Sequence, residues 1–233
     1  MNNIFFEILR PGINTTIQDL GRNNLYHIGV TISGAMDQRN YKIANALVGN
    51  PIDNAVIEFA YQGPLLKLKN GSLNFAITGD VNFNIIKNNN EIQKGECYQN
   101  YILNDEDKLD IISTQKSVYG YIAVGGILNV EKIWNSYSIN TKANIGPNNG
   151  KKYSINEKIF IKNLNEKFNK EKKITYKKSF NNTIRVIKGP HFDYFSNESK
   201  NFFFKEEYSV TNLSDRMGMR LKGTKLENVL NNN

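Results

Sequence analysis

Short runs of β-branched and aromatic residues, divided by turn-forming residues, constrain the fold of this chain most. Seven such runs cover residues 5–10, 55–61, 65–68, 73–77, 83–87, 109–113 and 118–124. Clusters of Asn, Gly, Asp and Pro separate them, and residues 88–91 and 104–107 have the composition of hairpin tips. Strands of this length and spacing pack as antiparallel sandwiches or barrels. We therefore expect a mostly β protein.

One short helix is predicted near the N-terminus, over residues 38–48. Asp37 is suited to cap its first turn, and Gly49 is suited to the left-handed position that ends a helix. Asn50 and Pro51 then prevent the helix from continuing. The residues on its apolar face are Tyr41, Ala44, Leu47 and Val48.

The composition allows a packed core and gives little reason to expect a nucleic-acid partner. Of the 233 residues, 39% are hydrophobic and 11% aromatic, which is enough to bury a sizeable core. The formal net charge of +8 and the isoelectric point near 9.3 would suit an acidic partner. The lysines, however, are scattered among Asn, Ile and Glu, which indicates a compositional bias rather than a binding face.

Cysteine and histidine are too few for several kinds of site. Cys97 is the single cysteine, so an intrachain disulfide is impossible and a reducing compartment is expected. Its neighbours supply no positive charge to lower its pKa, so a buried, inert thiol is the simpler interpretation. His27 and His191 lie far apart in the sequence, and no metal site is expected.

The ends of the chain and its hydropathy indicate a cytoplasmic protein with no membrane contact. The N-terminus lacks the basic region and the long apolar core of a signal peptide. No apolar run approaches the length of a membrane span. No phosphate-binding loop or dinucleotide fingerprint is present, since Gly125 and Gly126 follow a strand without opening a helix.

Composition divides the chain into two predicted domains. Residues 1–165 form the first, residues 166–182 a polar linker, and residues 183–233 the second. In the second domain the strand pattern restarts at residues 184–187 and 208–211. Residues 183–190 faintly echo residues 5–12, because both are strands that end in a basic residue and a Gly/Pro turn. This echo hints at two related barrels.

A glycine-dense polar stretch, residues 12–37, is the first candidate site. Glycines allow the backbone to approach a ligand or another strand closely, and polar groups on such turns are typical of sites. Arg22 suits an anion, because guanidinium binds phosphate or carboxylate with two hydrogen bonds. Arg216, beside Ser214, Asp215 and Gly218, marks a second candidate. An ion pair that braces a turn is the alternative for each arginine.

Four further residues have a catalytic or binding interpretation and a structural one. His27 is a conceivable general base or a hydrogen-bonded structural histidine. Asp37 is a candidate acid or base, although a helix cap is the simpler role. Glu58 lies in mid-strand on an apolar side, where a carboxylate needs a partner, so it belongs to a structural ion pair or to a site. Asp80 follows a strand at a turn and fits a loop-borne site or a plain β-turn.

A family resemblance appears at these residues. Residues 12–22, 29–37 and 44–50 resemble the biotin-dependent carboxyltransferase-like family, which includes the C-type component of 5-oxoprolinase, allophanate hydrolase subunit 2 and the antagonist of a sporulation kinase inhibitor. Further matches run in the same order over nearly the whole chain. They fall at Glu58, Gly63-Pro64, Thr78-Gly79, Tyr121-Ile122-Ala123-Val124-Gly125-Gly126, Gly189-Pro190 and Ser214-Asp215-Arg216-Met217-Gly218.

The resemblance implies two cyclophilin-like β-barrel domains and an ATP-dependent hydrolase of cyclic amides. The activity implied is the opening of 5-oxoproline to glutamate in complex with A-type and B-type 5-oxoprolinase components, with ATP shared among them. Phosphorylation would activate the lactam carbonyl, and the phosphate requires cations. The implied substrate- and phosphate-binding residues are Gln18, Asp19, Arg22, Ser33, Asn45, Asp80 and Arg216. The catalytic base stays open among His27, Asp37 and Glu58.

Two other functions fit the resemblance. One is a regulatory module that binds a kinase inhibitor resembling the B-type component and catalyses nothing. The other is a carboxyltransferase subunit of a biotin-dependent urea carboxylase and allophanate system. A departure from the family favours the first: residues 135–139 read Asn-Ser-Tyr-Ser-Ile where the family has a Gly-Ser-Arg-Ser-Thr-like segment. The chain also stops shortly after Gly223, so the second barrel is expected to be incomplete, a C-terminal truncation.

Overall fold

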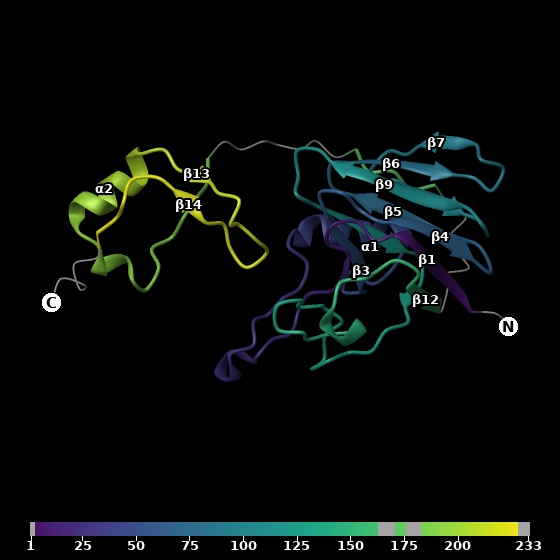
Figure 1. The fold of residues 1–233 in the computed structure, drawn as a ribbon, viewed down its shortest axis with the longest axis horizontal. Helices are drawn as coiled ribbons and strands as arrows, with labels where there is room; N and C mark the ends of the chain where they lie inside the picture. Colours follow the sequence, from purple (N-terminus) through teal and green to yellow (C-terminus); the bar gives the residue numbers. More distant parts are fainter. Residues whose placement is uncertain (1–2, 163–170, 176–182, 228–233) are drawn as a thin grey trace. The chain divides into compact units, whose positions relative to one another are not determined.

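The computed structural model describes residues 3–162, 171–175 and 183–227. The chain divides into two compact units, unit 1 (Met1–Tyr176) and unit 2 (Lys177–Asn233), whose elements are labelled in Figure 1. The boundary between them falls within the predicted linker, residues 166–182, of which 166–170 and 176–182 lie outside the described residues. The division into domains 1–165 and 183–233 stays a prediction.

The first sheet of unit 1 has one face on the core and one toward solvent. Its seven antiparallel strands follow the order β11-β12-β1-β4-β9-β6-β7. β4 and β6 alternate buried and half-buried residues, as expected when only one face is covered. The strands are β1 (Ile4–Arg10), β4 (Leu65–Lys69), β6 (Val81–Ile86), β7 (Ile92–Lys94), β9 (Lys108–Thr114), β11 (Ile127–Leu128) and β12 (Lys158–Lys162).

The second sheet is covered on both faces. Its order is β2-β3-β10-β5-β8, and every residue of β3 and β5 is buried. One face contributes Ile57, Phe59, Phe75 and Ile77 to the core shared with the first sheet. The other face packs against α1 (Gln38–Val48), as Figure 1 shows. The strands are β2 (Thr16–Gln18), β3 (Val56–Ala60), β5 (Leu73–Thr78), β8 (Asn100–Leu103) and β10 (Tyr119–Val124).

The predicted helix is confirmed with its caps. The Asp37 side chain accepts a hydrogen bond from Asn40 N at 3.0 Å, and Gly49 ends the helix with φ 76°. The predicted apolar face is buried against the second sheet, where Tyr41, Ala44, Leu47 and Val48 meet Val56, Ala76, Tyr121 and Ala123. Local capping and an apolar face thus specify this element completely.

All seven predicted runs in residues 5–124 overlap strands, but one of the two hairpin tips is wrong. Residues 88–91 do join β6 to its antiparallel neighbour β7. Residues 104–107 form a turn, with Asp107 N donating to Asn104 O at 3.1 Å. That turn carries the chain from β8 in one sheet to β9 in the other, because β8 pairs with β5 and β9 pairs with β4 and β6.

Residues 171–175 lie along the outer edge of β8. Asn100 N donates to Lys172 O at 3.0 Å, and Ile174 N donates to Tyr98 O at 2.8 Å. An ion pair of 2.7 Å between Lys173 and Glu96 adds to this pairing. The contact covers part of a strand edge whose backbone groups would otherwise face water.

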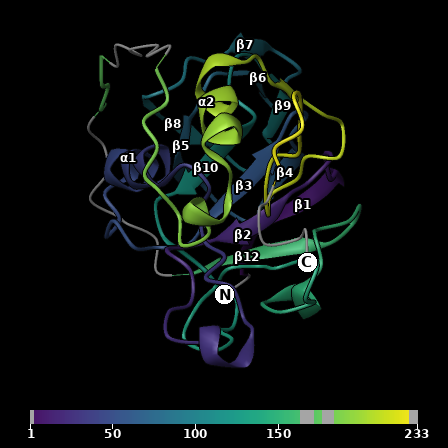
Figure 2. The same cartoon turned by 90° about the vertical axis from the view of Figure 1, so that its left-hand side faces the viewer.

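Unit 2 contains the 3₁₀ turn η3 (Phe192–Tyr194), α2 (Asn197–Lys205), β13 (Ser209–Val210) and β14 (Leu221–Lys222), drawn in green to yellow in Figure 2. The predicted strand at 184–187 is wrong. That segment pairs with no strand in the described part of the chain, and Ile184 and Ile187 are 86% and 95% exposed. A β-branched run becomes a strand only where a partner satisfies its backbone. The run at 208–211 forms the shorter β13.

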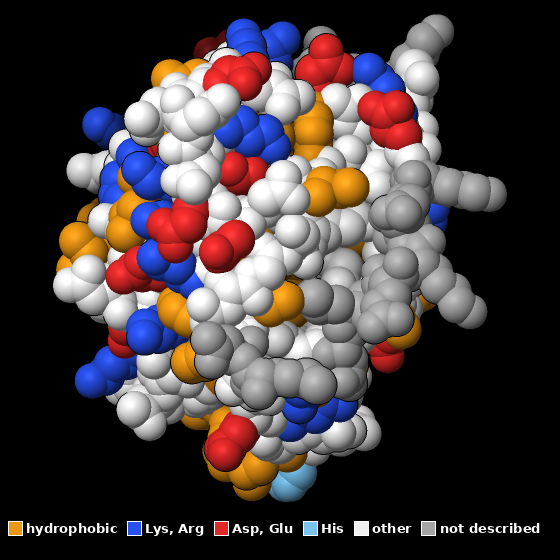
Figure 3. Space-filling model, turned by 90° about the vertical axis from the view of Figure 1, so that its right-hand side faces the viewer, with side chains coloured by type: hydrophobic (Ala, Val, Ile, Leu, Met, Phe, Trp, Pro, Cys, Tyr) orange, Lys and Arg blue, Asp and Glu red, His pale blue; other side chains and the backbone are white. Residues whose placement is uncertain are grey.

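The prediction of a mostly β protein is confirmed, whereas closure of the sheets into cyclophilin-like barrels stays a prediction. On the face of unit 1 in Figure 3, basic and acidic side chains are interspersed. Lys67 and Lys69, for example, both pair with Glu106. Among the described residues, none of the helices combines the length and the apolar character that crossing a membrane requires.

Candidate functional site

The glycine-dense stretch forms a projecting loop, residues 22–34, that we call the finger. It extends from the body of unit 1 at the bottom of both Figure 1 and Figure 2. At its base the two chain segments meet through Arg22 N, which donates to Ile32 O at 2.8 Å, and Ala35 N, which donates to Asp19 O at 2.9 Å. The finger therefore leaves and re-enters the body at one closed junction.

Two glycines make this junction possible. A Cβ atom at Gly21 would lie 2.5 Å from Ile32 O, and one at Gly34 would lie 2.8 Å from the backbone of Leu20. Both residues also have positive φ, +89° and +84°, which side chains disfavour. Of the two interpretations of the glycine pattern, the structure shows the close approach of one backbone to another.

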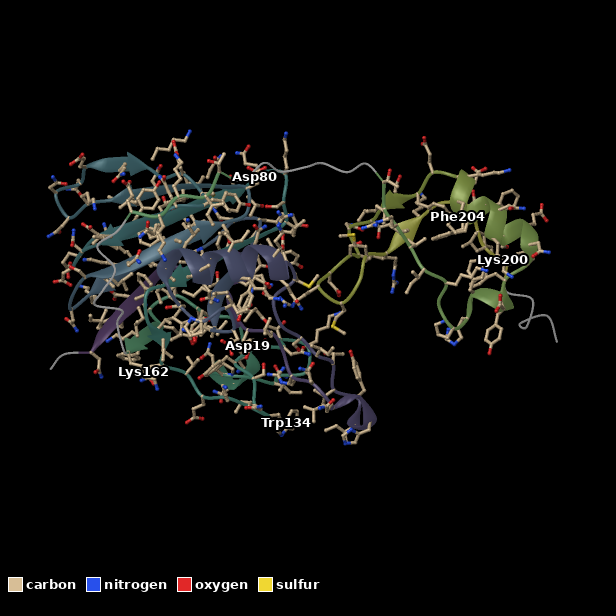
Figure 4. All side chains as sticks on the ribbon, turned by 180° about the vertical axis from the view of Figure 1, so that it is seen from behind. Asp19, Asp80, Trp134, Lys162, Lys200 and Phe204 are labelled. Carbon is tan, nitrogen blue, oxygen red and sulfur yellow. The ribbon has the colours of Figure 1, made fainter. Side chains whose placement is uncertain are left out.

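Next to the base of the finger, the Asp19 carboxylate is buried and accepts four hydrogen bonds. The donors are Ser136 Oγ at 2.7 Å, Ser138 Oγ at 2.5 Å, Tyr137 N at 2.7 Å and Gly21 N at 2.8 Å. Figure 4 shows Asp19 in the interior of unit 1. These four hydrogen bonds fix the position of the carboxylate and satisfy its acceptors within the protein.

Arg22 supplies the opposite charge to this cluster. Its side chain is 2% exposed and donates to Ser138 O at 2.5 Å and to Ser33 Oγ at 3.3 Å. Burial lowers the pKa of Arg22, and the negative charge of Asp19 opposes that shift. The Nε atom has no hydrogen-bond partner among the described residues. The guanidinium thus faces protein oxygens and has one buried donor to spare.

Gln18 has the complementary spare group, an acceptor. Its Nε2 donates to Ile139 O at 2.9 Å and to Thr16 Oγ1 at 3.0 Å, while its Oε1 is buried with no partner in the described part of the chain. Four predicted binding residues, Gln18, Asp19, Arg22 and Ser33, are thereby brought to one place. Their binding role stays a prediction, since the interactions described for them are with protein groups.

A second buried group lies between the finger and α1. Glu58 is 1% exposed, and its Oε2 accepts from Met36 N at 2.9 Å. Tyr121 Oη, which accepts from Asp37 N at 2.6 Å, lies against the same carboxylate. Burial, followed by the charge of Glu58, raises the pKa of Tyr121. Glu58 therefore contacts this tyrosine with its carboxylate, whereas Asp37 contacts it only through its backbone N–H and uses its carboxylate to accept from Asn40.

The remaining predicted residues lie elsewhere. His27 is exposed in the finger tip. Asn45 is buried, donating to Asn54 O at 2.8 Å and accepting from Asn50 at 3.2 Å, so it ties the end of α1 to the following loop. Asp80, at the β5–β6 turn, accepts from Lys116 N at 3.3 Å and lies well apart from Asp19 in Figure 4. Arg216 belongs to a turn of unit 2.

Sequence reasoning missed the role of Ser136, Ser138 and Tyr121. Residues 135–139 differ from the segment described above at Asn135, Tyr137 and Ile139, yet both serines are present and both hydroxyls donate to Asp19. Two serines separated by one residue were a readable signal, because alternate side chains of an extended segment share a side. Within the described residues, no group of three or more His, Cys, Asp or Glu could hold a metal ion.

Comparisons with known proteins place this fold and sequence in one family. The model of the carboxyltransferase domain, subdomain A and B, matches residues 28–233. The chain is 30% identical to the urea amidolyase of Lachancea kluyveri over 94% of its own length and 13% of that protein. It is 26% identical to the C subunit of 5-oxoprolinase from Escherichia coli over 93% of its own length and 68% of that protein.

A solved structure agrees with these matches. The urea carboxylase of Kluyveromyces lactis superposes with a TM-score of 0.80 at 26% identity, and the match covers 98% of this chain and 21% of that one. The chain spans only 12–13% of the length of the urea amidolyases. Because the family model matches most of the sequence, the chain belongs to the carboxyltransferase domain family, subdomain A and B.

Proposed function

We propose that this protein is a component of an ATP-dependent 5-oxoprolinase, a hydrolase that opens the cyclic amide 5-oxoproline to glutamate in the cytoplasm. The observation that carries the proposal is the match with the C subunit of 5-oxoprolinase. It covers 93% of this chain and 68% of the Escherichia coli protein, and 95% and 69% in Haemophilus influenzae. The name of those relatives implies further subunits, so we propose A-type and B-type 5-oxoprolinase components as partners.

The proposed contribution of unit 1 is a fixed polar scaffold beside the substrate. Asp19 and Arg22 have charges of opposite sign and lie in one buried, hydrogen-bonded cluster. Such clusters hold the neighbouring loops rigidly. The Arg22 guanidinium is 2% exposed and donates to Ser138 O and Ser33 Oγ. Because both hydrogen bonds described for Arg22 are to protein oxygens, no step through ATP is assigned to it.

Reconstitution tests the proposal. The chain is co-expressed with homologues of the A-type and B-type components, and glutamate formed from 5-oxoproline is measured with and without ATP. We expect turnover only when all components and ATP are present. A stable complex that forms no glutamate would contradict the enzyme and favour the regulatory module that binds a kinase inhibitor.

Carboxyl transfer in a urea-degrading system is the second candidate, supported by the 30% identity to urea amidolyases of two yeasts. In that case activity would require a biotinylated partner. Addition of avidin to the reconstituted mixture separates the candidates. Loss of turnover of urea on avidin addition would favour carboxyl transfer, whereas 5-oxoproline opening should continue unchanged.

A further inference from the structure

The tip of the finger is an ordered turn that exposes two large apolar side chains. The 3₁₀ turn η1 (Tyr26–Ile28) is closed by Ile28 N and Val30 N, which both donate to Leu25 O, at 3.1 and 3.2 Å. Gly29 N donates to Tyr26 O at 2.9 Å. Tyr26 is nevertheless 67% exposed and Ile28 56% exposed. The tip thus exposes apolar side chains on a backbone that is held in place by its own hydrogen bonds.

The finger carries little charge for an exposed loop. Residues 23–36 include no Lys, Arg, Asp or Glu, although these residues make up 22% of the sequence. A stretch of that length would carry about three of them at the average frequency. Whatever the tip contacts is therefore recognised by shape and apolar surface rather than by opposite charge.

The base of the finger is braced on both sides. Arg22 is fixed by Ser138 O and Ser33 Oγ. From the neighbouring segment, Asn140 Nδ2 donates to Thr31 Oγ1 at 3.2 Å and to Ser33 Oγ at 3.4 Å. An element ordered before it binds loses little conformational entropy on binding. The buried cluster at the base of the finger therefore has a structural use, which is to keep the finger ordered before it binds.

Exposed apolar side chains are common on protein surfaces, and a single one indicates nothing. Ile92, in the edge strand β7, is 64% exposed and is such a case. Tyr26 and Ile28 differ because they lie together on a projecting turn with a braced base. Tyrosine in such a position is typical of the few residues that dominate binding energy at protein interfaces.

The relatives indicate what kind of surface the tip meets. In the urea carboxylase of Kluyveromyces lactis and in the urea amidolyases, the matching region is 21% and 12–13% of a much longer chain. In those proteins this region works within a larger body of polypeptide. Another protein surface is accordingly the occupant that the comparisons favour.

We propose that the finger tip docks into an uncharged, apolar pocket of a partner protein in the complex, with Tyr26 and Ile28 as the inserted side chains. The inference rests on the proposed function, since it concerns the partners of that complex. It assigns the contact to residues 25–30 and gives the Asp19–Arg22 cluster a positioning role behind it.

The test compares two matched variants of the full chain, Ile28→Asp and Ile92→Asp. Each places a charge at an exposed isoleucine, one in the finger tip and one in β7. Binding to the purified pair of A-type and B-type components is measured by isothermal titration calorimetry. We expect Ile28→Asp to raise Kd about 30-fold or more, the effect of losing a dominant contact, and Ile92→Asp to change it less than about twofold. Tyr26→Ala serves as the second tip variant, and thermal melting checks that all variants are folded.

The outcomes separate this inference from the proposed function. If the unaltered chain forms the complex and Ile28→Asp binds as well as Ile92→Asp, the docking role of the finger is wrong while the proposed function stands. If the unaltered chain binds neither component, both are wrong. If size-exclusion chromatography shows that Ile28→Asp instead breaks a dimer of this chain, the occupant is a second copy and docking into another protein is overturned.

Discussion

The two units use the same kinds of hydrophobic residue with opposite results. In unit 1, Phe59, Phe75 and Phe83 have no exposed surface. In the described part of unit 2 no hydrophobic side chain is buried, and Phe203 and Phe204 are 40% and 63% exposed. Apolar residues form a core only where two layers face each other. Unit 1 has two sheets and a helix to do so, whereas the described part of unit 2 has one α-helix and a two-stranded hairpin.

The apolar side chains of unit 2 line an open hollow instead of packing into a core. Its volume is about 600 Å³, and it is lined by Val186, Phe192, Phe195, Phe203, Phe204 and Leu226, among others. The following experiments test this contrast between a packed and an unpacked unit, and how tightly the parts of unit 1 are held.

The largest effect is expected from paired Phe→Ala substitutions, one in each unit. Phe59→Ala should lower the free energy of unfolding of unit 1 by about 3–5 kcal/mol, because it leaves a cavity in a packed core. Phe203→Ala should cost less than about 1 kcal/mol, because the side chain is already 40% exposed. The single tryptophan, Trp134, lies in unit 1 and reports only that unit, so native-state hydrogen exchange is used to measure the free energy of unfolding of each unit separately. Equal shifts for both variants would contradict the contrast.

The glycines of the finger provide the next comparison, within unit 1. Gly29→Ala should cost about 1 kcal/mol, because φ is +76° but a Cβ atom would meet nothing within 4 Å. Gly34→Ala should cost about 2–4 kcal/mol, since it adds an overlap with backbone to the same conformational penalty. Urea denaturation of both variants measures the difference. Equal losses would show that the junction opens freely, which the packed base of the finger does not predict.

A smaller loss of stability, similar in the two units, is expected when the helix caps are removed. Asp37 accepts from Asn40 N in α1, and Ser196 accepts from Ser199 N in α2 at 3.1 Å. Replacing either by alanine should cost its own helix about 1 kcal/mol, because a cap depends on local geometry rather than on the packing around it. Hydrogen exchange of the first-turn amides reads each helix separately. A much greater loss in α1 would mean that tertiary packing, rather than capping, dominates there.

The smallest change in the free energy of unfolding is expected from the ionisation of Cys97, because burial raises the pKa of its thiol to about 11, far above neutral pH. The folded pKa lies above the unfolded value, so the neutral thiol favours folding fully below pH 9 and loses that contribution as pH rises toward 11. Alkylation by iodoacetamide should be slow at pH 8 and accelerate in that window. Because unit 2 has no cysteine, fast alkylation at pH 8 would show that unit 1 itself opens.

The sequence predicted correctly those helices and strands that are specified by residues close together in the chain. Helix α1 was predicted with both caps, and the seven main strands were recognised by composition. Strands such as β7 (Ile92–Lys94), all of whose residues are exposed, carry no burial pattern to recognise. The run at 184–187 carries a strong β pattern and forms no strand, because pairing depends on a partner that sequence periodicity does not report.

The candidate site shows the same division. Proximity of Gln18, Asp19 and Arg22 follows from their spacing in the chain. Their engagement by Ser136 and Ser138 does not, because the hydrogen bond from Ser138 to Asp19 joins residues 119 positions apart. Arg22 braces a turn through hydrogen bonds to Ser138 O and Ser33 Oγ, whereas its predicted contact with an anion stays a prediction.

By itself, the sequence determined the helix, the main strands and the presence of a glycine-dense stretch of turns at residues 12–37. These features depend on φ, capping and periodicity, which act over a few residues. Only the tertiary structure decided that Arg22 would be buried, that the finger would project with Tyr26 and Ile28 outward, and that unit 2 would leave its phenylalanines uncovered. Burial depends on which distant segments meet, and no local pattern encodes that encounter.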